Sequence, residues 1–134
     1  MAVPELHGDA LKAVKHRGSH MQIIAAAGSG KTEVVSQRVA DLLADGVEPR
    51  GIVAFTFTER AAEELKRRIS RPVEERLGHA ALDLLVGLFV GTIHSFCFQL
   101  RQRHVSRYET YNVLDVNPAQ ERLIELHVGG AADL

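Results

Sequence analysis

The sequence predicts an α/β fold, in which a parallel sheet is flanked by helices. Two observations lead to this prediction. Short apolar runs alternate with longer segments of helical periodicity, and a glycine-rich turn joins the first apolar run to a helix. The 134 residues are enough for one domain with one core. In sheets of this kind the crossovers are right-handed, and ligands bind at the carboxyl ends of the strands.

The first half of the chain carries the stronger element signals. We expect, in order, a helix over residues 5–16, a strand over 21–26, a helix over 31–45, a strand over 52–58 and a helix over about 59–69. The run 21–26 is almost entirely apolar, which predicts a strand buried on both faces of the sheet. Gly46 is expected to end the second helix, and Thr58 is a suitable N-cap for the third.

The second half continues the alternation of elements. After an interruption at Pro72, we expect a helix over roughly 73–86, a strand over 88–92, a helix over 94–104, a short strand at 113–114 and a last helix near 118–127. Residues 1–128 are assigned to one domain, and residues 129–134 to a frayed tail or a truncation point. The turn at 25–32, the end of strand 52–58 and the turn at 91–94 are expected to share one edge of the sheet.

Composition excludes several classes of protein. The chain is 46% hydrophobic and 25% charged, which is ordinary for a globular domain, and no apolar stretch approaches 18 residues, so we expect no membrane partner. There is no apolar signal core at the N-terminus. Cys97 is the single cysteine, which rules out an intrachain disulfide and suits a reducing, cytoplasmic compartment. We expect Cys97 to be a buried helix residue rather than a nucleophile.

The glycine-rich turn has the residues of a phosphate-binding loop. Backbone N–H groups in such a turn converge on a phosphate, and the following helix adds a partial positive charge. Lys31 can reach the β- and γ-phosphates, and the Thr32 hydroxyl can ligate Mg²⁺. We predict these two as the catalytic residues. The predicted nucleotide-binding residues are Ala25, Ala26, Ala27, Gly28, Ser29, Gly30, Lys31 and Thr32. The alternative is an ordinary turn that caps a structural helix.

Three segments together resemble one family. Residues 25–32 are close to A-G-A-G-S-G-K-T, residues 56–65 are similar to T-F-T-N-K-A-A-x-E-M, and residues 91–97 are similar to G-T-F-H-S-F. On these residues the chain resembles the N-terminal RecA-like domain of UvrD/Rep-type superfamily 1 DNA helicases, over most of its length. The resemblance implies an incomplete RecA-like phosphate-loop NTPase fold, ATP and Mg²⁺ as cofactors, and a hydrolase of DNA repair whose other domains lie outside this chain.

The resemblance also implies contact with single-stranded DNA through the second and third segments. Hydroxyl groups and backbone amides at helix starts suit phosphate contacts, and His94 can donate to a phosphate or a base edge. The residues implied in DNA binding are Thr56, Phe57, Thr58, Arg60, Thr92, His94 and Ser95. Phe57 follows Phe55 by two residues in the predicted strand, and we expect one of the two in the core while the other can stack on a base.

The chain departs from the family at several positions. Ala10 stands where the family has an adenine-reading glutamine, and Ala26 replaces a glycine. No acidic pair follows an apolar strand, because 63–64 and 74–75 fall in helical patterns and Asp115 is single. We therefore expect nucleotide binding and weak DNA binding, with little or no turnover. The alternatives are a non-catalytic phosphate-loop module that binds DNA, and a small phosphate-loop kinase, which the apolar helical stretch 71–90 disfavours.

Overall fold

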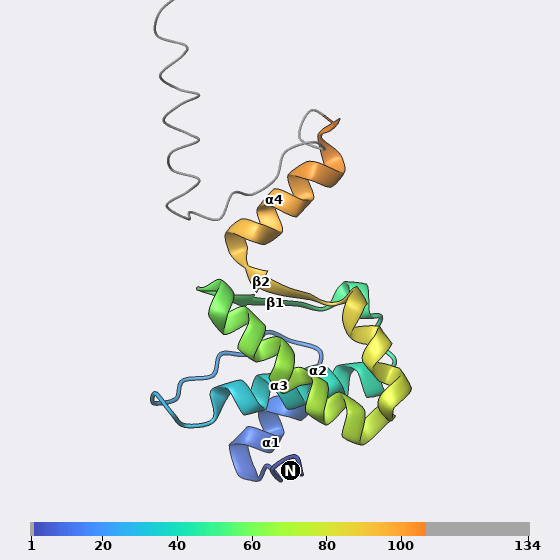
Figure 1. Cartoon of the computed structure of the whole chain (residues 1–134). Helices are drawn as coiled ribbons and strands as arrows, with labels where there is room; N and C mark the ends of the chain where they lie inside the picture. The colour runs from blue at the N-terminus through green and yellow to red at the C-terminus, as the bar shows by residue number, and fades with distance from the viewer. Residues whose placement is uncertain (1, 107–134) are drawn as a thin grey trace, which may run out of the picture. The chain divides into compact units, whose positions relative to one another are not determined.

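The structure, a computed structural model, describes residues 2–106 of the chain (Figure 1). The elements are, in order, α1 (Gly8–Lys15), α2 (Lys31–Ala44), the 3₁₀ turn η1 (Pro49–Gly51), β1 (Val53–Thr56), α3 (Glu59–Leu77), the 3₁₀ segment η2 (His79–Gly87), β2 (Phe89–Thr92) and α4 (Ile93–His104). The chain divides into two compact units, Met1–Phe96 and Cys97–Leu134, and the sheet and the buried core described below both belong to the first unit.

The sheet consists of β1 and β2, which run parallel and are connected by α3 and η2. Val53 is paired with Phe89 and Thr56 with Thr92, so both strands end at the same edge. The predicted strands over 52–58 and 88–92 are confirmed, with shorter bounds. Because α3 and α4 begin directly after these ends, the register brings two helix starts together.

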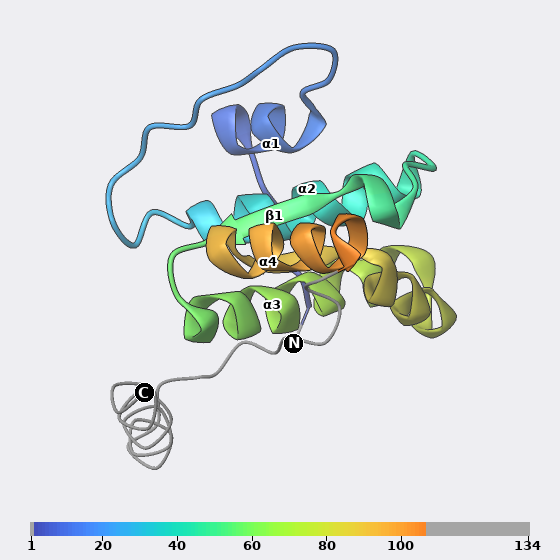
Figure 2. The ribbon, with the colours of Figure 1, turned by 90° about the horizontal axis from the view of Figure 1, so that it is seen from above.

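A core between α2 and α3 supports this sheet. In Figures 1 and 2 the two helices lie next to the strands, and α1 lies on the far side of α2. The buried core consists of Val39, Ala40, Leu43, Ile52, Leu65, Ile69, Val73 and Val90. Full burial of a valine, leucine or isoleucine side chain stabilises the fold by roughly 1.5–3 kcal/mol. A smaller cluster of Ala13, Val14 and Val34 attaches α1 to α2.

Helix ends follow the local chemistry that the sequence indicates. The Thr58 hydroxyl accepts a 3.1 Å hydrogen bond from the amide of Ala61, which confirms Thr58 as the N-cap of α3. Gly46 has a φ of +84° and follows the end of α2, where its amide donates to the carbonyl of Leu43. Both positions therefore fix where the chain leaves or enters a helix.

The predicted strand over 21–26 is wrong. These residues have no strand pairing in the part of the chain that the structure describes, and they are exposed, Ile24 at 88%. A parallel strand exists only through hydrogen bonds to a neighbouring strand, and within residues 2–106 the sheet contains β1 and β2 alone. Apolar composition could not supply that missing neighbour.

The predicted interruption at Pro72 is also wrong, because α3 runs through it to Leu77. Pro72 is buried together with Ile69 and Val73, so packing against the core offsets the hydrogen bond that the proline removes. Gly78, with a φ of +87°, ends the helix instead. The helix predicted over 73–86 is therefore split between the end of α3 and the 3₁₀ segment η2.

The other expected helices are present, and one cysteine differs from its expected burial. Helices 31–45 and 94–104 are confirmed as α2 and α4, and the first helix is shorter than predicted. Cys97 is exposed on α4, which corrects the expectation that it is buried; none of the residues of α4 is buried. The predicted strand 113–114, helix 118–127 and tail 129–134 lie outside the described residues.

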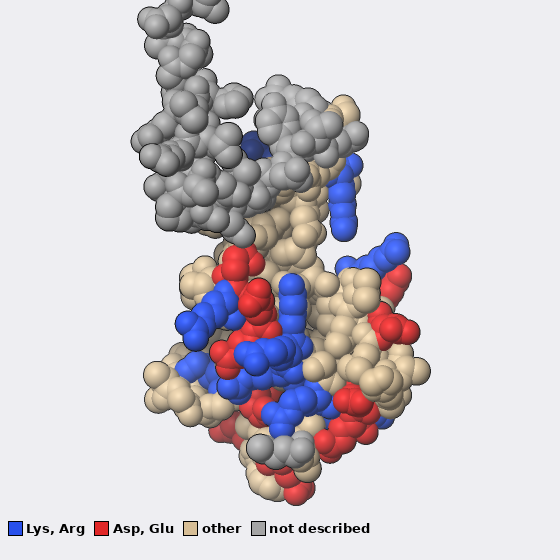
Figure 3. Space-filling model, in the orientation of Figure 1, with Lys and Arg blue, Asp and Glu red and all other residues tan. Residues whose placement is uncertain are grey.

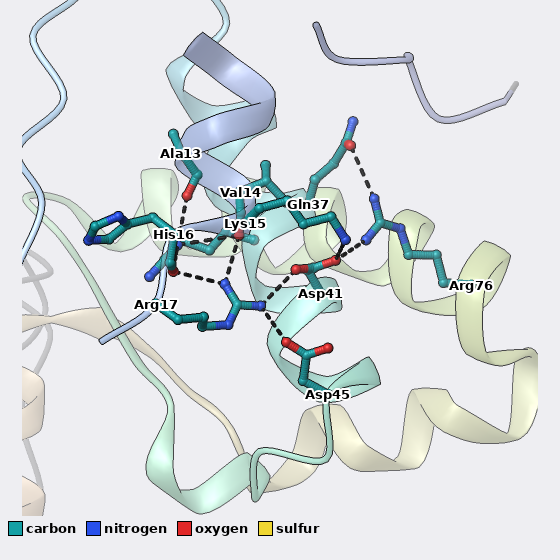
Figure 4. A network of polar contacts seen from close by, with 10 residues as sticks. Ala13, Val14, Lys15, His16, Arg17, Gln37, Asp41, Asp45 and Arg76 are labelled. Atoms are coloured by element: carbon teal, nitrogen blue, oxygen red, sulfur yellow. Dashed lines mark hydrogen bonds and ion pairs between the residues drawn. The ribbon is translucent and has the colours of Figure 1, made fainter. Parts of the chain in front are cut away.

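A buried carboxylate connects three helices (Figure 4). Asp41 of α2 is 3% exposed and accepts hydrogen bonds from Lys15 at 2.5 Å, Arg17 at 2.7 Å and Arg76 of α3 at 3.0 Å. Burial by itself would raise the pKa of this carboxyl, but the hydrogen bonds from Lys15 and Arg17 outweigh it and hold the pKa below its ordinary value. The network fixes the end of α1, and with it the start of the loop that leads to residues 25–32.

Candidate nucleotide and DNA site

The loop over residues 25–32 has the backbone of an anion-binding turn. Gly28 and Gly30 have φ values of +74° and +86°, in the left-handed region that residues with a side chain adopt only with strain. The amide of Ser29 donates to the carbonyl of Ala26 at 3.3 Å. Gly30 is the N-cap of α2 and provides no side chain to its first turn. The amides at the start of α2 therefore remain available to an anion. Ala26 is not among the residues with positive φ, so its methyl group introduces no strain.

Lys31 closes over this loop. Its Nζ donates to the carbonyls of Ala25 at 2.5 Å and Ala26 at 2.6 Å, which places the positive charge above the turn. Thr32 follows in the first turn of α2, exposed, and its carbonyl accepts from Ser36 at 2.8 Å. The donors and the charge suit a triphosphate, and the Thr32 hydroxyl suits a metal ion carried by it. Within residues 2–106 there is no group of three His, Cys, Asp or Glu that could hold a metal by itself.

Two cavities flank the loop. One, of about 430 Å³, is lined by Lys31 and Thr32 and by residues of β1 and α3, including Thr56 at the carboxyl end of β1. The other, of about 380 Å³, lies against α1 and is lined by Ala10 together with Ala25 and Lys31. Both volumes are within the range of small-molecule sites. The phosphate loop and the end of β1 therefore adjoin one cavity, and Ala10 adjoins the other.

The ends of the two strands are joined by a hydrogen-bonded group of three side chains. Oε1 of Glu59, the first residue of α3, accepts from the Ser95 hydroxyl at 2.8 Å and from the Thr92 hydroxyl at 2.9 Å. The amide of Ser95 donates to the Thr92 hydroxyl at 3.2 Å. Hydrogen bonds from Ser95 and then Thr92 lower the pKa of Glu59, so its carboxyl is charged at neutral pH.

Glu59 is a residue that the sequence analysis missed. A charged residue directly after an N-cap is common for electrostatic reasons alone, so its type gave no signal of a site. The signal lay in the strand register, since Thr56 pairs with Thr92 and the residues that follow each strand must meet. The structure thus joins Thr92 and Ser95, two of the residues implied in DNA binding, through a carboxylate that was not predicted.

The two phenylalanines of the second segment have different environments. Phe57 is 99% exposed, whereas Phe55 is 48% exposed and its ring lies 6.3 Å from that of Phe89 and 5.3 Å from that of Phe96. Neither ring is fully buried, but Phe55 packs against other aromatic rings and Phe57 is exposed to solvent. Thr58 is engaged as a helix cap, and the Thr56 hydroxyl donates to its carbonyl at 3.0 Å.

Surface charge on the face drawn in Figure 3 is mixed. Lysine and arginine side chains interleave with aspartate and glutamate there, without a continuous basic patch on that face. Arg60 and His94, two of the predicted DNA contacts, are exposed.

These features coincide with a match to a known family. The model of the UvrD/REP helicase N-terminal domain matches residues 6–131 of the chain. The chain belongs to the UvrD/REP helicase family. The predicted phosphate-loop fold, incomplete and RecA-like, is consistent with this membership and with the small parallel sheet.

Individual UvrD/REP relatives agree with the family match. The chain is 38% identical over 108 residues to the ATP-dependent DNA helicase PcrA of Bacillus subtilis, an alignment that covers 78% of this chain and 14% of that protein. It is 34% identical over 117 residues to DNA helicase II of Haemophilus influenzae, covering 82% of this chain and 15% of that protein. It is equally 34% identical over 117 residues to UvrD1 of Mycobacterium leprae, covering 84% and 14%.

The chain therefore spans about one seventh of the length of these helicases. All three are named as DNA helicases, and the names of the Bacillus subtilis and Mycobacterium leprae proteins also describe them as ATP-dependent. No helix among the described residues of this UvrD/REP domain is long and apolar enough to cross a membrane. The similarity to helicases favours the helicase interpretation of the phosphate loop over the kinase alternative.

Proposed function

We propose that this chain is the ATP-binding and single-stranded-DNA-binding portion of a UvrD-like ATP-dependent DNA helicase. One observation carries the proposal: Lys31 and Thr32 of the phosphate loop line the same cavity as Thr56, at the strand end where the second and third segments meet. A nucleotide bound at the phosphate loop and a single DNA strand bound at the sheet edge would thus occupy neighbouring positions. This proximity would favour coupling between the two ligands.

In this proposal the loop residues Ala25 to Thr32 hold the triphosphate of ATP. The backbone amides at the start of α2 and the left-handed turn at Gly28 and Gly30 support phosphate binding. Lys31 would leave the carbonyls of Ala25 and Ala26 to reach the β- and γ-phosphates. The Thr32 hydroxyl would hold Mg²⁺, which neutralises phosphate charge when it is bound.

The DNA side of the proposal rests on exposed groups after the two strands. Phe57 offers a stacking surface, which binds bases without sequence preference. Arg60 and His94 offer exposed donors for the backbone of the strand. Such a DNA-dependent role would place the protein in the cytoplasm, with the remaining helicase domains as partners.

We further propose that this chain alone turns over little ATP. Hydrolysis needs a carboxylate that holds the metal and orders the attacking water. The acidic pairs at 63–64 and 74–75 both lie within α3 rather than directly after a strand, and of these four residues Glu64 lines the cavity of Lys31 and Thr32. A non-catalytic module that binds DNA without ATP is the second candidate, and Ala10, which offers no hydrogen bond on the wall of the cavity beside the loop, favours it.

Calorimetry with Mg²⁺·ATP separates these candidates. The wild-type chain is expected to bind, and Lys31→Ala to lose binding, while the control Lys66→Ala on α3 retains it. The same titration with a single-stranded oligonucleotide present tests coupling, which is expected to tighten or weaken ATP binding measurably. Absence of ATP binding by the wild-type chain would favour the non-catalytic module. Hydrolysis at an ordinary helicase rate by the isolated chain would overturn the proposed low turnover.

A further inference from the structure

The turn from β1 into α3 presents an aromatic ring and a carboxylate two residues apart. Phe57 is almost completely exposed, and Glu59 is exposed at the first position of α3. Their Cα atoms are separated by two peptide units, and so by no more than about 7.6 Å. A nucleobase that stacks on the Phe57 ring would therefore have its edge within reach of the Glu59 side chain.

The hydroxyls beside Glu59 have no proton left for a phosphate. Ser95 donates its hydroxyl proton to Oε1 of Glu59, and Thr92 donates to the same oxygen. The two hydroxyl oxygens also lie 2.9 Å apart, so the Thr92 hydroxyl proton has the Ser95 oxygen as a second acceptor. Each hydroxyl carries one donor only. A phosphate here would have to break these bonds and approach a negative charge, although the residue types resemble those of a phosphate site.

The same carboxylate has an acceptor position that remains open. Within residues 2–106 the hydrogen bonds that Glu59 accepts through its side chain all go to Oε1, so Oε2 can accept from a ligand. A carboxylate accepts well from an exocyclic amino group such as N4 of cytosine. Thymine has a carbonyl oxygen at the equivalent position, and two acceptors repel each other.

We propose that Phe57 and Glu59 form a base-reading site, which selects a nucleobase with an exocyclic amino group over thymine. The proposal rests on the single-stranded-DNA binding proposed above and assigns a preference to that site. Phe57 supplies stacking, Oε2 of Glu59 supplies the acceptor, and Thr92 and Ser95 act as positioning residues that fix the carboxylate. The strand's phosphates would then be held at other exposed groups of the same edge, such as Arg60.

Cytosine and thymine oligonucleotides of equal length give the sharpest test, because both are pyrimidines and differ at this position. Fluorescence anisotropy at neutral pH and low, fixed salt is expected to show about fivefold or greater preference of the wild-type chain for oligo-dC over oligo-dT. Glu59→Gln keeps the size and an acceptor for Ser95 and Thr92, but it presents an amide donor. This variant is expected to lose or reverse the preference.

Two further variants exclude simple charge effects and misfolding. Glu63→Gln removes the same charge from an exposed position one turn further along α3, and is expected to keep the dC preference. Ser95→Ala leaves the carboxylate but removes one of its positioning bonds, and is expected to weaken the preference without changing the salt dependence. Circular dichroism of each variant establishes that it is folded.

The possible outcomes separate this inference from the proposed function. Equal affinity of the wild-type chain for both oligonucleotides, or an unchanged preference in Glu59→Gln, would overturn the base-reading site while DNA binding stands. If neither oligonucleotide binds at low salt, the proposed DNA binding itself is overturned, and the base-reading site with it. A preference for oligo-dT in the wild-type chain would also overturn the site, because the edge would then read carbonyl groups instead.

Discussion

The hydroxyl of Ser95 donates a 2.8 Å hydrogen bond to Glu59, although 36 residues separate the two in the sequence. This bond joins the start of α4 to the start of α3, at the edge where the parallel strands end. Two segments that each resemble a DNA-contacting motif are thus held by one carboxylate. Their relative position is fixed by side-chain chemistry as well as by the sheet.

Removing the charge of Asp41 should destabilise the fold. Asp41→Asn leaves Lys15, Arg17 and Arg76 around a neutral group, and the free energy of unfolding is expected to fall by about 2–3 kcal/mol. This is less than for a completely buried pair, since the three cations are partly exposed. Urea denaturation followed by circular dichroism measures the change. Asp83→Asn at an exposed position is the control, and an equal loss in both variants would argue against a special role for Asp41.

The same carboxylate predicts how stability responds to acid. The pKa of Asp41 is lower in the folded chain than its ordinary value of 3.8, so the folded state binds its proton less readily than the unfolded state. The stabilisation is complete above pH 3.8 and is lost as the pH falls from there through the folded pKa. The difference in unfolding free energy between wild type and Asp41→Asn should therefore shrink on acidification. A difference that is constant with pH would contradict the ion-pair account.

The left-handed turn at Gly30 should tolerate no side chain. Gly30→Ala is expected to cost about 1–2 kcal/mol in loop strain and to weaken Mg²⁺·ATP binding, because the φ of +86° must be kept for the amides to converge. Gly51→Ala is the matched control, since Gly51 has open space and no positive φ. Calorimetry of both variants measures the effect. Wild-type affinity in Gly30→Ala would show that the turn relaxes without consequence.

Substitution of Phe57 should affect DNA binding, whereas substitution of Phe55 should affect the stability of the fold. Phe57→Ala is expected to leave the melting temperature unchanged, because the ring is 99% exposed, and to weaken oligonucleotide binding by about five- to a hundredfold. Phe55→Ala is expected to lower stability, with about 0.5–1.5 kcal/mol lost for each ring contact with Phe89 and Phe96, beyond the loss of buried area. Thermal melts and anisotropy on the same samples check both. The reverse pattern would assign Phe57 to packing.

Local chemistry made much of this structure predictable. The cap at Thr58, the stop at Gly46 and the periodicity of α2 and of the first part of α3 all depend on residues close in sequence, and each was confirmed. The phosphate loop was recognisable for the same reason, because glycines at positive φ and a following helix are local features. Nucleotide binding at this loop stays a prediction.

The wrong predictions concern properties that depend on distant partners. An apolar run such as 21–26 becomes a strand only if another strand pairs with it, and Pro72 ends a helix only if packing does not compensate. The part played by Glu59 was hidden for the same reason, since its two hydrogen-bond donors come from the other strand's end. Sequence reasoning identified the residue types of the site but could not supply the register that joins them.

The segment over residues 18–30 leaves α1 through Arg17, which is tied to Asp41 of α2, and it returns to the first residue of the same helix. Both ends of this segment are thus attached to α2. Doubling the length of such a loop costs only about 0.6 kcal/mol in loop-closure entropy. A fluorophore attached at the exposed position His20 would lie outside the core, in the same segment as the phosphate loop. A fluorescent label in the segment over residues 18–30 could therefore report nucleotide binding while it lies outside the packed faces of α1 and α2.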